Sequence, residues 1–348
     1  LLNGQVLIDK SVNTISDYSL PDSLKLTNLD ASFFVESLDM QQFIEVNSFT
    51  TQTNVEDFND ISLNGQLFTN GISLELNRFN FRTESAVFEF SAEASPVNIF
   101  EQDIEDQLLN ASYLLNVERI NIGNNIINRF QTPYLQLKQS LEFSGNVNGD
   151  LDSLYIDNFQ LINGNSFVIT DGVLTDLNSE EFAYDFSLTN LVIDATDLRQ
   201  ILPQTQLDSI QIDKYGLTTV QGDIFGDLRS LNARLDLDSD LGRAEIDTGL
   251  EFDGDQNFNF TAKLDSLDIS PIFRDSTGTS VLNGRIVTNG QGYNRSASAQ
   301  TRLMFAGSKI KSHNFQALDA NITYLENSGE YTISAIQGQT EGSASGSF

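Results

Sequence analysis

The chain has 348 residues, of which 39% are hydrophobic and 20% charged, and its formal net charge is -30. This apolar content argues against wholesale disorder, and the negative charge disfavours binding to nucleic acid phosphates or anionic membrane surfaces. The absence of cysteine excludes disulfides, thiolate nucleophiles and cysteine-based zinc sites.

No apolar run approaches the ~18 residues that a membrane-spanning helix needs. The chain begins and ends inside its own residue pattern, without a secretory leader. We therefore expect it to be a piece of a longer protein.

The first predicted elements are strands and one short helix. Apolar residues alternate with polar ones over 86–92, as expected for a strand with one apolar face. Ser95 and Pro96 follow, a favoured N-cap and a favoured first helical residue. We predict that they open a helix near 96–109, in which apolar residues recur every four positions.

The middle of the chain repeats this arrangement. Strict alternation over 141–151 predicts a strand, and a second strand is expected over 182–188. A short helix is predicted over 196–202, where Pro203 stops it.

The last part of the chain contains the clearest alternation. Strands are predicted over 218–228, 231–238, 244–252 and 258–264, with Phe225 as an apolar exception on the polar side. A Ser-Pro pair at 270–271 predicts another helical turn. Gly, Asn and Asp between the strands favour tight reversals, so we expect antiparallel sheets with one apolar and one solvated face.

A degenerate repeat runs through the chain. An apolar-x-Gly-x-apolar core recurs around Gly4, Gly65, Gly145, Gly222 and Gly284, which by subtraction are 61, 80, 77 and 62 residues apart. At ~8–12 residues per strand, one unit would hold about six strands. We divide the chain accordingly into segments 1–130, 131–216, 217–280 and 281–348 of one continuous elongated architecture.

Three stretches carry a resemblance to a known family. They are GDIFGDLRSLNARLDLDSDLGRAEIDTGLEFDG from Gly222, LDSLDISPIF from Leu264 and TNLVIDATDLRQILP from Thr189. These stretches resemble the periplasmic portion of TamB/AsmA-like proteins (translocation and assembly module), in the form seen in the Bacteroidota. The resemblance covers most of the chain and is strongest from about residue 140 onward.

The resemblance implies a fold and a function. The fold would be all-β, an elongated antiparallel repeat sheet bent into a U-shaped groove (a β-taco) with a few short helices. The function would be non-enzymatic: a periplasmic conduit that carries phospholipid acyl chains between the inner and outer membranes. The longer protein would have an inner-membrane helix and an outer-membrane β-barrel partner of the Omp85 type. No cofactor, metal or nucleic acid is expected.

The alternation selects the residues that would line such a groove. Aliphatic and Phe side chains make non-directional contacts, which would let an acyl chain slide. The predicted lining residues are Phe88, Phe90, Leu141, Phe143, Val147, Leu151, Phe182, Phe186, Val220, Ile224, Leu228, Leu231, Leu235, Ile246, Leu250, Phe252, Phe258, Phe260 and Leu264.

Three alternatives stay open. An alternating apolar face is also typical of the closed core of a β-sandwich. Within the same family, the chain could instead assist the assembly or secretion of outer-membrane β-barrels or autotransporters by offering strand edges. From another class, it could be a secreted β-solenoid adhesin or polysaccharide-active protein, although a parallel β-helix has a shorter repeat.

The residues give little support for catalysis or metal binding. His313, the sole histidine, lies in a polar setting that is typical of a surface residue. Asp236, Asp238 and Asp240 begin like a calcium loop, but Leu241 stands where that loop requires glycine. Phosphate-binding, dinucleotide-binding and nucleophile-elbow motifs are absent from the sequence.

Overall fold

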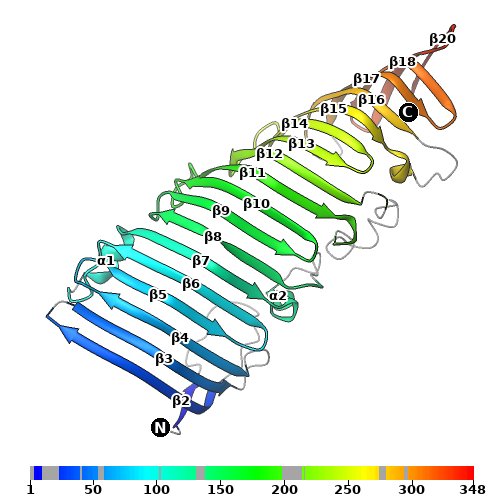
Figure 1. Ribbon diagram of the computed structural model, residues 1–348. Helices are drawn as coiled ribbons and strands as arrows, with labels where there is room; N and C mark the ends of the chain where they lie inside the picture. The colour runs from blue at the N-terminus through cyan, green and yellow to red at the C-terminus, as the bar shows by residue number, and fades with distance from the viewer. Residues whose placement is uncertain are drawn as a thin grey trace. The chain divides into compact units, whose positions relative to one another are not determined.

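The computed structural model describes residues 4–9, 23–39, 41–53, 59–101, 103–130, 138–197, 214, 216–273, 280–293 and 297–348. The chain divides into two compact units, Leu1–Gly164 and Asn165–Phe348. Both are built from antiparallel strands that follow one another in the sheet in chain order (Figure 1). The predicted all-β antiparallel class with a few short helices is therefore confirmed, and antiparallel pairing excludes a parallel β-helix for the described strands.

The first unit contains nine strands and two helices among its described residues. They are β1 (Gly4–Asp9), β2 (Ser23–Leu38), β3 (Gln41–Thr53), β4 (Asp60–Thr69), β5 (Leu74–Arg82), β6 (Ala86–Ser95), α1 (Ile104–Leu109), β7 (Ser112–Ile122), α2 (Asn124–Phe130), β8 (Leu141–Gly149) and β9 (Leu154–Asn163). The helices α1 and α2 lie at opposite ends of the strands (Figure 1).

The second unit contains eleven strands and one 3-10 helix among its described residues. They are β10 (Ser166–Thr175), β11 (Ala183–Asp194), β12 (Leu217–Asp227), β13 (Ser230–Ser239), β14 (Gly242–Glu251), β15 (Asn257–Asp268), η2 (Ser270–Phe273), β16 (Val281–Gln291), β17 (Ser298–Ile310), β18 (His313–Leu325), β19 (Ser328–Gln337) and β20 (Thr340–Ser347).

The predicted helices are only partly confirmed. The helix expected from Pro96 begins later, at Ile104, because β6 continues to Ser95 and the buried Val97 donates its backbone N–H to the Ile72 carbonyl at 2.8 Å. The turn at η2 is where the Ser-Pro pair predicts it. Of the helix expected over 196–202, the described residues 196 and 197 are helical, and the rest lies outside the described residues.

From Gly65 onward the repeat contains four strands rather than about six. The repeat glycines Gly65, Gly145, Gly222 and Gly284 lie in β4, β8, β12 and β16, whereas Gly4 lies in β1, three strands before β4. The estimate was too high because β4–β19 have 9 to 13 residues each, whereas an average strand has about 5 or 6.

Each of these glycines lies where the pairing is interrupted by a β-bulge. The register shifts opposite Gly145 in both neighbouring strands, β7 and β9, and next to Gly284 in both β15 and β17. A bulge inserts an extra residue into one strand and increases the local twist of the sheet. The sequence repeat therefore marks a repeated bulge.

Candidate functional site

One face of the first unit is apolar, and its side chains align across neighbouring strands. The alignment follows from the pairing register, which places one apolar residue of each strand opposite the next. A first row runs through Val35, Ile44, Leu67, Leu76, Ala92, Leu115, Val147 and Ile156. A second row runs through Ala31, Phe49, Leu63, Phe81, Phe88, Ile120, Phe143 and Leu161.

The second unit has the same kind of face. Its central row contains no polar side chain over ten strands, from β11 to β20. The central row is Leu188, Gly222, Leu235, Ile246, Ala262, Ile286, Leu303, Ala320, Ile333 and Ala344. Because neighbouring strands are about 4.8 Å apart, each row presents an apolar group at that interval across the sheet.

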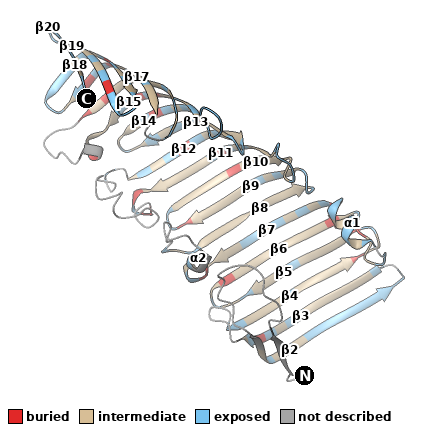
Figure 2. Cartoon of the chain, turned by 180° about the vertical axis from the view of Figure 1, so that it is seen from behind, coloured by how far each residue is buried: buried red, intermediate tan, exposed pale blue. Residues whose placement is uncertain are grey.

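These apolar faces are not covered by a second layer of strands. Within the described residues, all strands belong to one antiparallel sheet, in which each strand pairs with its neighbours in the chain. Eight of the fifteen buried hydrophobic residues are alanines, whereas most larger apolar side chains remain half-buried (Figure 2). A closed sandwich would bury its Leu, Ile and Phe side chains, so this alternative is wrong for each unit.

Aromatic rings on the apolar face of the second unit lie over glycines of the neighbouring strand. A Cβ atom on Gly172 would lie 2.3 Å from the Phe186 ring, and one on Gly290 would lie 2.4 Å from the Phe258 ring. The same arrangement pairs Phe305 with Gly284 and Tyr331 with Gly346. Because each ring occupies the space above a glycine, it lies along the sheet instead of projecting from it.

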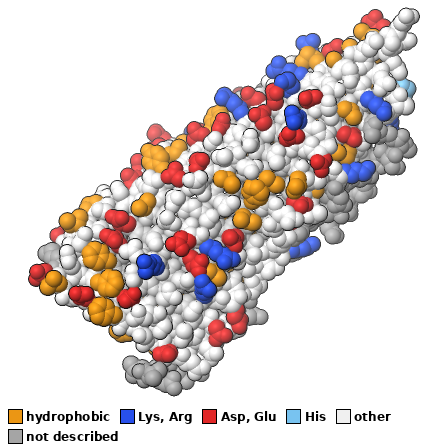
Figure 3. All heavy atoms as spheres, viewed as in Figure 1, with side chains coloured by type: hydrophobic (Ala, Val, Ile, Leu, Met, Phe, Trp, Pro, Cys, Tyr) orange, Lys and Arg blue, Asp and Glu red, His pale blue; other side chains and the backbone are white. Residues whose placement is uncertain are grey.

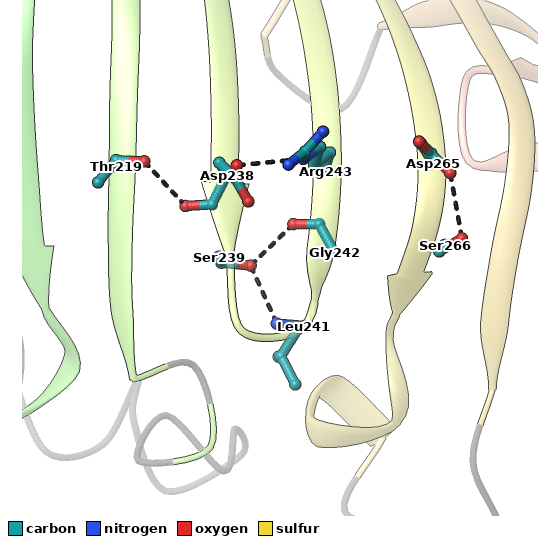
Figure 4. Close-up of polar contacts among 8 residues, drawn as sticks. All are labelled: Thr219, Asp238, Ser239, Leu241, Gly242, Arg243, Asp265 and Ser266. Carbon is teal, nitrogen blue, oxygen red and sulfur yellow. Dashed lines mark hydrogen bonds and ion pairs between the residues drawn. The ribbon is translucent and has the colours of Figure 1, made fainter.

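The opposite face of the second unit carries charged pairs. Cross-strand ion pairs join Arg243 to Asp238 at 3.1 Å and Lys263 to Glu245 at 2.7 Å. Figure 4 shows Arg243 and Asp238 beside the hairpin between β13 and β14, where Ser239 donates to the Gly242 carbonyl. Such exposed pairs contribute little to stability, because solvent and salt screen the attraction between their charges. Figure 3 shows one face of the molecule, on which acidic and basic side chains are interspersed.

The polar face also contains shallow depressions. One of 760 Å³ over β12–β15 is lined by acidic and basic side chains, including Asp236, Glu245 and Lys263. The hydrogen bond and charge of Glu245 raise the pKa of Lys263 above its ordinary value of 10.5. Within the depression, Lys263 pairs with Glu245 and Arg243 pairs with Asp238. Phe225, the apolar exception, lies under the Arg234 guanidinium at 5.6 Å, which explains its place on this face.

Most of the predicted lining residues lie in strands and on one face of their unit. Phe88, Phe143 and Val147 belong to the rows of the first unit, and Leu235 and Ile246 belong to the central row. Four predicted residues lie instead at connections between strands, where alternation no longer defines a face: Leu151, Phe182, Leu228 and Phe252. The other predicted residues, Phe90, Leu141, Phe186, Val220, Ile224, Leu231, Leu250, Phe258, Phe260 and Leu264, lie within strands.

The structure adds residues that the alternation did not select. Leu76 and Phe81 of β5 share a face although one number is even and the other odd, because the bulge at Arg78 (φ 51°) shifts the period by one residue. In β7, a register shift between Val117 and Ile120 likewise places these two residues, one odd and one even in number, on the same face. Ile286 and Ile333 lie in strands with clear alternation, so the sequence signal was present there.

Other kinds of site find no support in the described part of the chain. None of its helices has the length and apolar content needed to cross a bilayer. Among the same residues, no group of three or more His, Cys, Asp or Glu side chains is arranged to hold a metal ion. In comparisons with known proteins, the chain matches no protein-family model, no curated protein and no solved structure.

Proposed function

We propose that this chain is a segment of a TamB/AsmA-like lipid transfer protein and that the apolar face of each unit holds phospholipid acyl chains. The observation that supports this most is the central row, which contains no polar side chain across ten strands of one sheet. In this proposal the protein is not an enzyme. It works in the periplasm as part of a longer protein, which has an inner-membrane anchor and binds an outer-membrane β-barrel partner.

The energetics suit a conduit better than a tight binding site. Burying one methylene contributes about 0.8 kcal/mol, and an acyl chain on a one-sided face would gain roughly half of that per group. Many weak contacts at intervals of about 4.8 Å hold the acyl chain without a deep free-energy minimum at any one place. Because the aromatic rings lie flat over glycines, they project little from the sheet. An acyl chain can therefore slide along the apolar face. The ion-paired opposite face stays in water.

The first prediction compares two substitutions in one strand. Ile333 belongs to the central row, and its neighbour Thr332 points to the polar face, where it lies opposite Asn321 and Ser345. Ile333→Glu places a charge against the acyl chains and should lower the co-purified phospholipid roughly tenfold. Thr332→Glu adds the same charge to the same strand and should leave the lipid unchanged. Native mass spectrometry of the purified chain measures the bound lipid.

A second variant and a measurement of folding distinguish a loss of lipid binding from misfolding. Ile246→Glu should behave like Ile333→Glu, and circular dichroism reports whether each variant keeps its β content. Equal loss of lipid in Ile333→Glu and Thr332→Glu would contradict the face assignment.

A different outcome would favour the assembly function. Among the described residues, β1 pairs only with Ser23–Leu29 of β2, and the exposed Phe33 and Phe34 lie farther along the same strand. An open apolar strand edge is a template for strand addition. If the wild-type chain carries no lipid but captures an outer-membrane β-strand peptide at this edge, strand addition replaces the lipid proposal.

A further inference from the structure

One end of the strands in the first unit exposes large apolar side chains. Because successive strands run in opposite directions, the connections β2–β3, β4–β5, β6–β7 and β8–β9 lie at this end. We call Leu38 and the connections 39–40, 70–73, 96–111 and 150–153 the α1 rim, of which residues 40 and 102 lie outside the described residues. Its exposed large apolar side chains are Leu38, Ile72, Phe100, Leu109 and Leu151. Exposed apolar groups gathered in this way are typical of an interaction site.

The charges of the α1 rim all have one sign. Its sequence contains no Lys or Arg and seven acidic residues, which are all exposed: Asp39, Glu101, Asp103, Glu105, Asp106, Asp150 and Asp152. In the described part of the unit, ion pairs join β5 to β6 and β7 to β8, and they do not involve these carboxylates. Hydrogen bonds from the backbone N–H groups of Ser153 and Asp152 lower the pKa of Asp150, which favours its charged form.

The connection that contains α1 is held in place by a small core of its own. Ala94, Val97 and Ala111 form a buried cluster, and Leu108 of α1 packs against it. The Gln107 side chain accepts a hydrogen bond from the Asn98 backbone N–H, which ties α1 to the chain before it. α1 lies at the ends of β6 and β7 (Figure 1). A surface that is already ordered loses little conformational entropy when a partner binds.

The spacing of the connections matches the rise of an α-helix. Consecutive connections of the α1 rim are two strands apart, which is about 9.6 Å. An α-helix rises about 10.5 Å over seven residues, so every seventh residue of a helix laid along the rim would reach the next connection. An extended segment would need about three residues for the same distance, and residues three apart face opposite sides of a strand.

We propose that the α1 rim binds an amphipathic, basic α-helix of a partner protein. The four connections span about 29 Å, which corresponds to about 20 helical residues. Apolar residues at every seventh position would contact the exposed Leu, Ile and Phe side chains, and Lys or Arg beside them would face the carboxylates. A second copy of this chain does not supply such a helix from its described residues, because α1 and α2 have six and seven residues. The proposal does not depend on lipid binding at the apolar face.

Fluorescence anisotropy with the full chain and a labelled synthetic peptide tests this proposal. The peptide consists of three heptads with Leu at positions a and d and Lys at positions e and g. It should bind, and its affinity should fall about tenfold between about 0.05 M and about 0.5 M sodium chloride. A peptide of the same composition in which Leu and Lys alternate favours a strand and should bind about fivefold more weakly.

Two charge variants locate the site. The double variant Asp103→Asn and Asp152→Asn removes two charges from the α1 rim and should weaken binding about fivefold at the lower salt concentration. Asn is as good an N-cap as Asp, so the start of α1 is preserved. The matched control, Glu330→Gln with Glu341→Gln, removes the same charge from exposed positions of the second unit and should have little effect.

Two apolar variants separate the contact from the charge. Leu109, which is 56% exposed, should weaken binding about fivefold when it is changed by Leu109→Ser. Leu325→Ser is the control, because Leu325 is 55% exposed in the second unit. Circular dichroism reports whether each variant keeps its β content.

Three results would overturn the proposal. The first is that the helical peptide does not bind, and the second is that the alternating peptide binds equally well. The third is that the variants of the α1 rim and their controls weaken binding equally, since the peptide would then respond only to the net charge of the chain.

Discussion

At three of the repeat positions, Gly145, Gly222 and Gly284, glycine is required by the backbone that faces it. Gly145 has φ 142° and Gly222 has φ 136°, a region that other residues rarely adopt. A Cβ atom would lie 2.8 Å from the Phe159 Cα in the first case and 1.9 Å from the Arg234 carbonyl oxygen in the second. The apolar-x-Gly-x-apolar pattern is therefore a backbone requirement of the bulge, and it would hold for any function of the sheet.

This account predicts a loss of stability on substitution. Gly145→Ala should lower the free energy of unfolding by about 2 kcal/mol, because both the backbone angle and the close contact become strained. Gly342→Ala is the control, since no atom lies within 4 Å of its added Cβ, and it should change the stability by less than about 0.5 kcal/mol. Urea unfolding measures both variants, and equal effects would contradict the steric explanation.

At the scale of elements, cross-strand pairs determine how far the side chains of the apolar face project from the backbone. The Tyr331 ring lies over Gly346 of the neighbouring strand, and only Tyr331 side-chain atoms are closest to a Cβ added there, at 2.7 to 2.9 Å. Such coverage of a sheet glycine by an aromatic ring stabilises a strand pair. The same pairing leaves the ring flat, which the proposed lipid path would need.

A double-mutant cycle tests the coupling of this pair. Gly346→Ala alone should destabilise β19–β20, since the added methyl displaces the ring, whereas in a Tyr331→Leu background it should be nearly neutral. The two changes should therefore couple by about 1 kcal/mol. Denaturant unfolding of the four proteins gives the coupling energy, and additive effects would show that the ring does not depend on the glycine.

At the scale of the whole molecule, the net charge of -30 opposes the folded state. Carboxylates that are close together in the folded chain repel one another, and salt screens this repulsion over about 8 Å at physiological ionic strength.

Raising sodium chloride from about 0.01 M to about 0.15 M should therefore increase the melting temperature. Differential scanning calorimetry measures the shift, and an equal osmolality of sucrose controls for effects unrelated to charge. A melting temperature that stays constant or falls with salt would mean that the cross-strand ion pairs outweigh the repulsion.

The sequence by itself determined the class of the fold, the antiparallel pairing and most of the apolar face. Period-2 alternation specifies these features locally, as in β13, where Leu231, Ala233, Leu235 and Leu237 share one face. The sequence also located the repeat glycines. It did not predict α2, and its helix near Pro96 began too early.

Only the tertiary structure decided where the face begins and ends, and whether it is open. Bulges such as the one at Arg78 shift the period, so alternation alone loses the face beyond them. Leu228 and Phe252 continue the alternation but lie just beyond the ends of β12 and β14, because strand ends depend on pairing with neighbours. The local pattern of a closed sandwich and of an open sheet is the same, and they differ only in whether a second layer covers the apolar face.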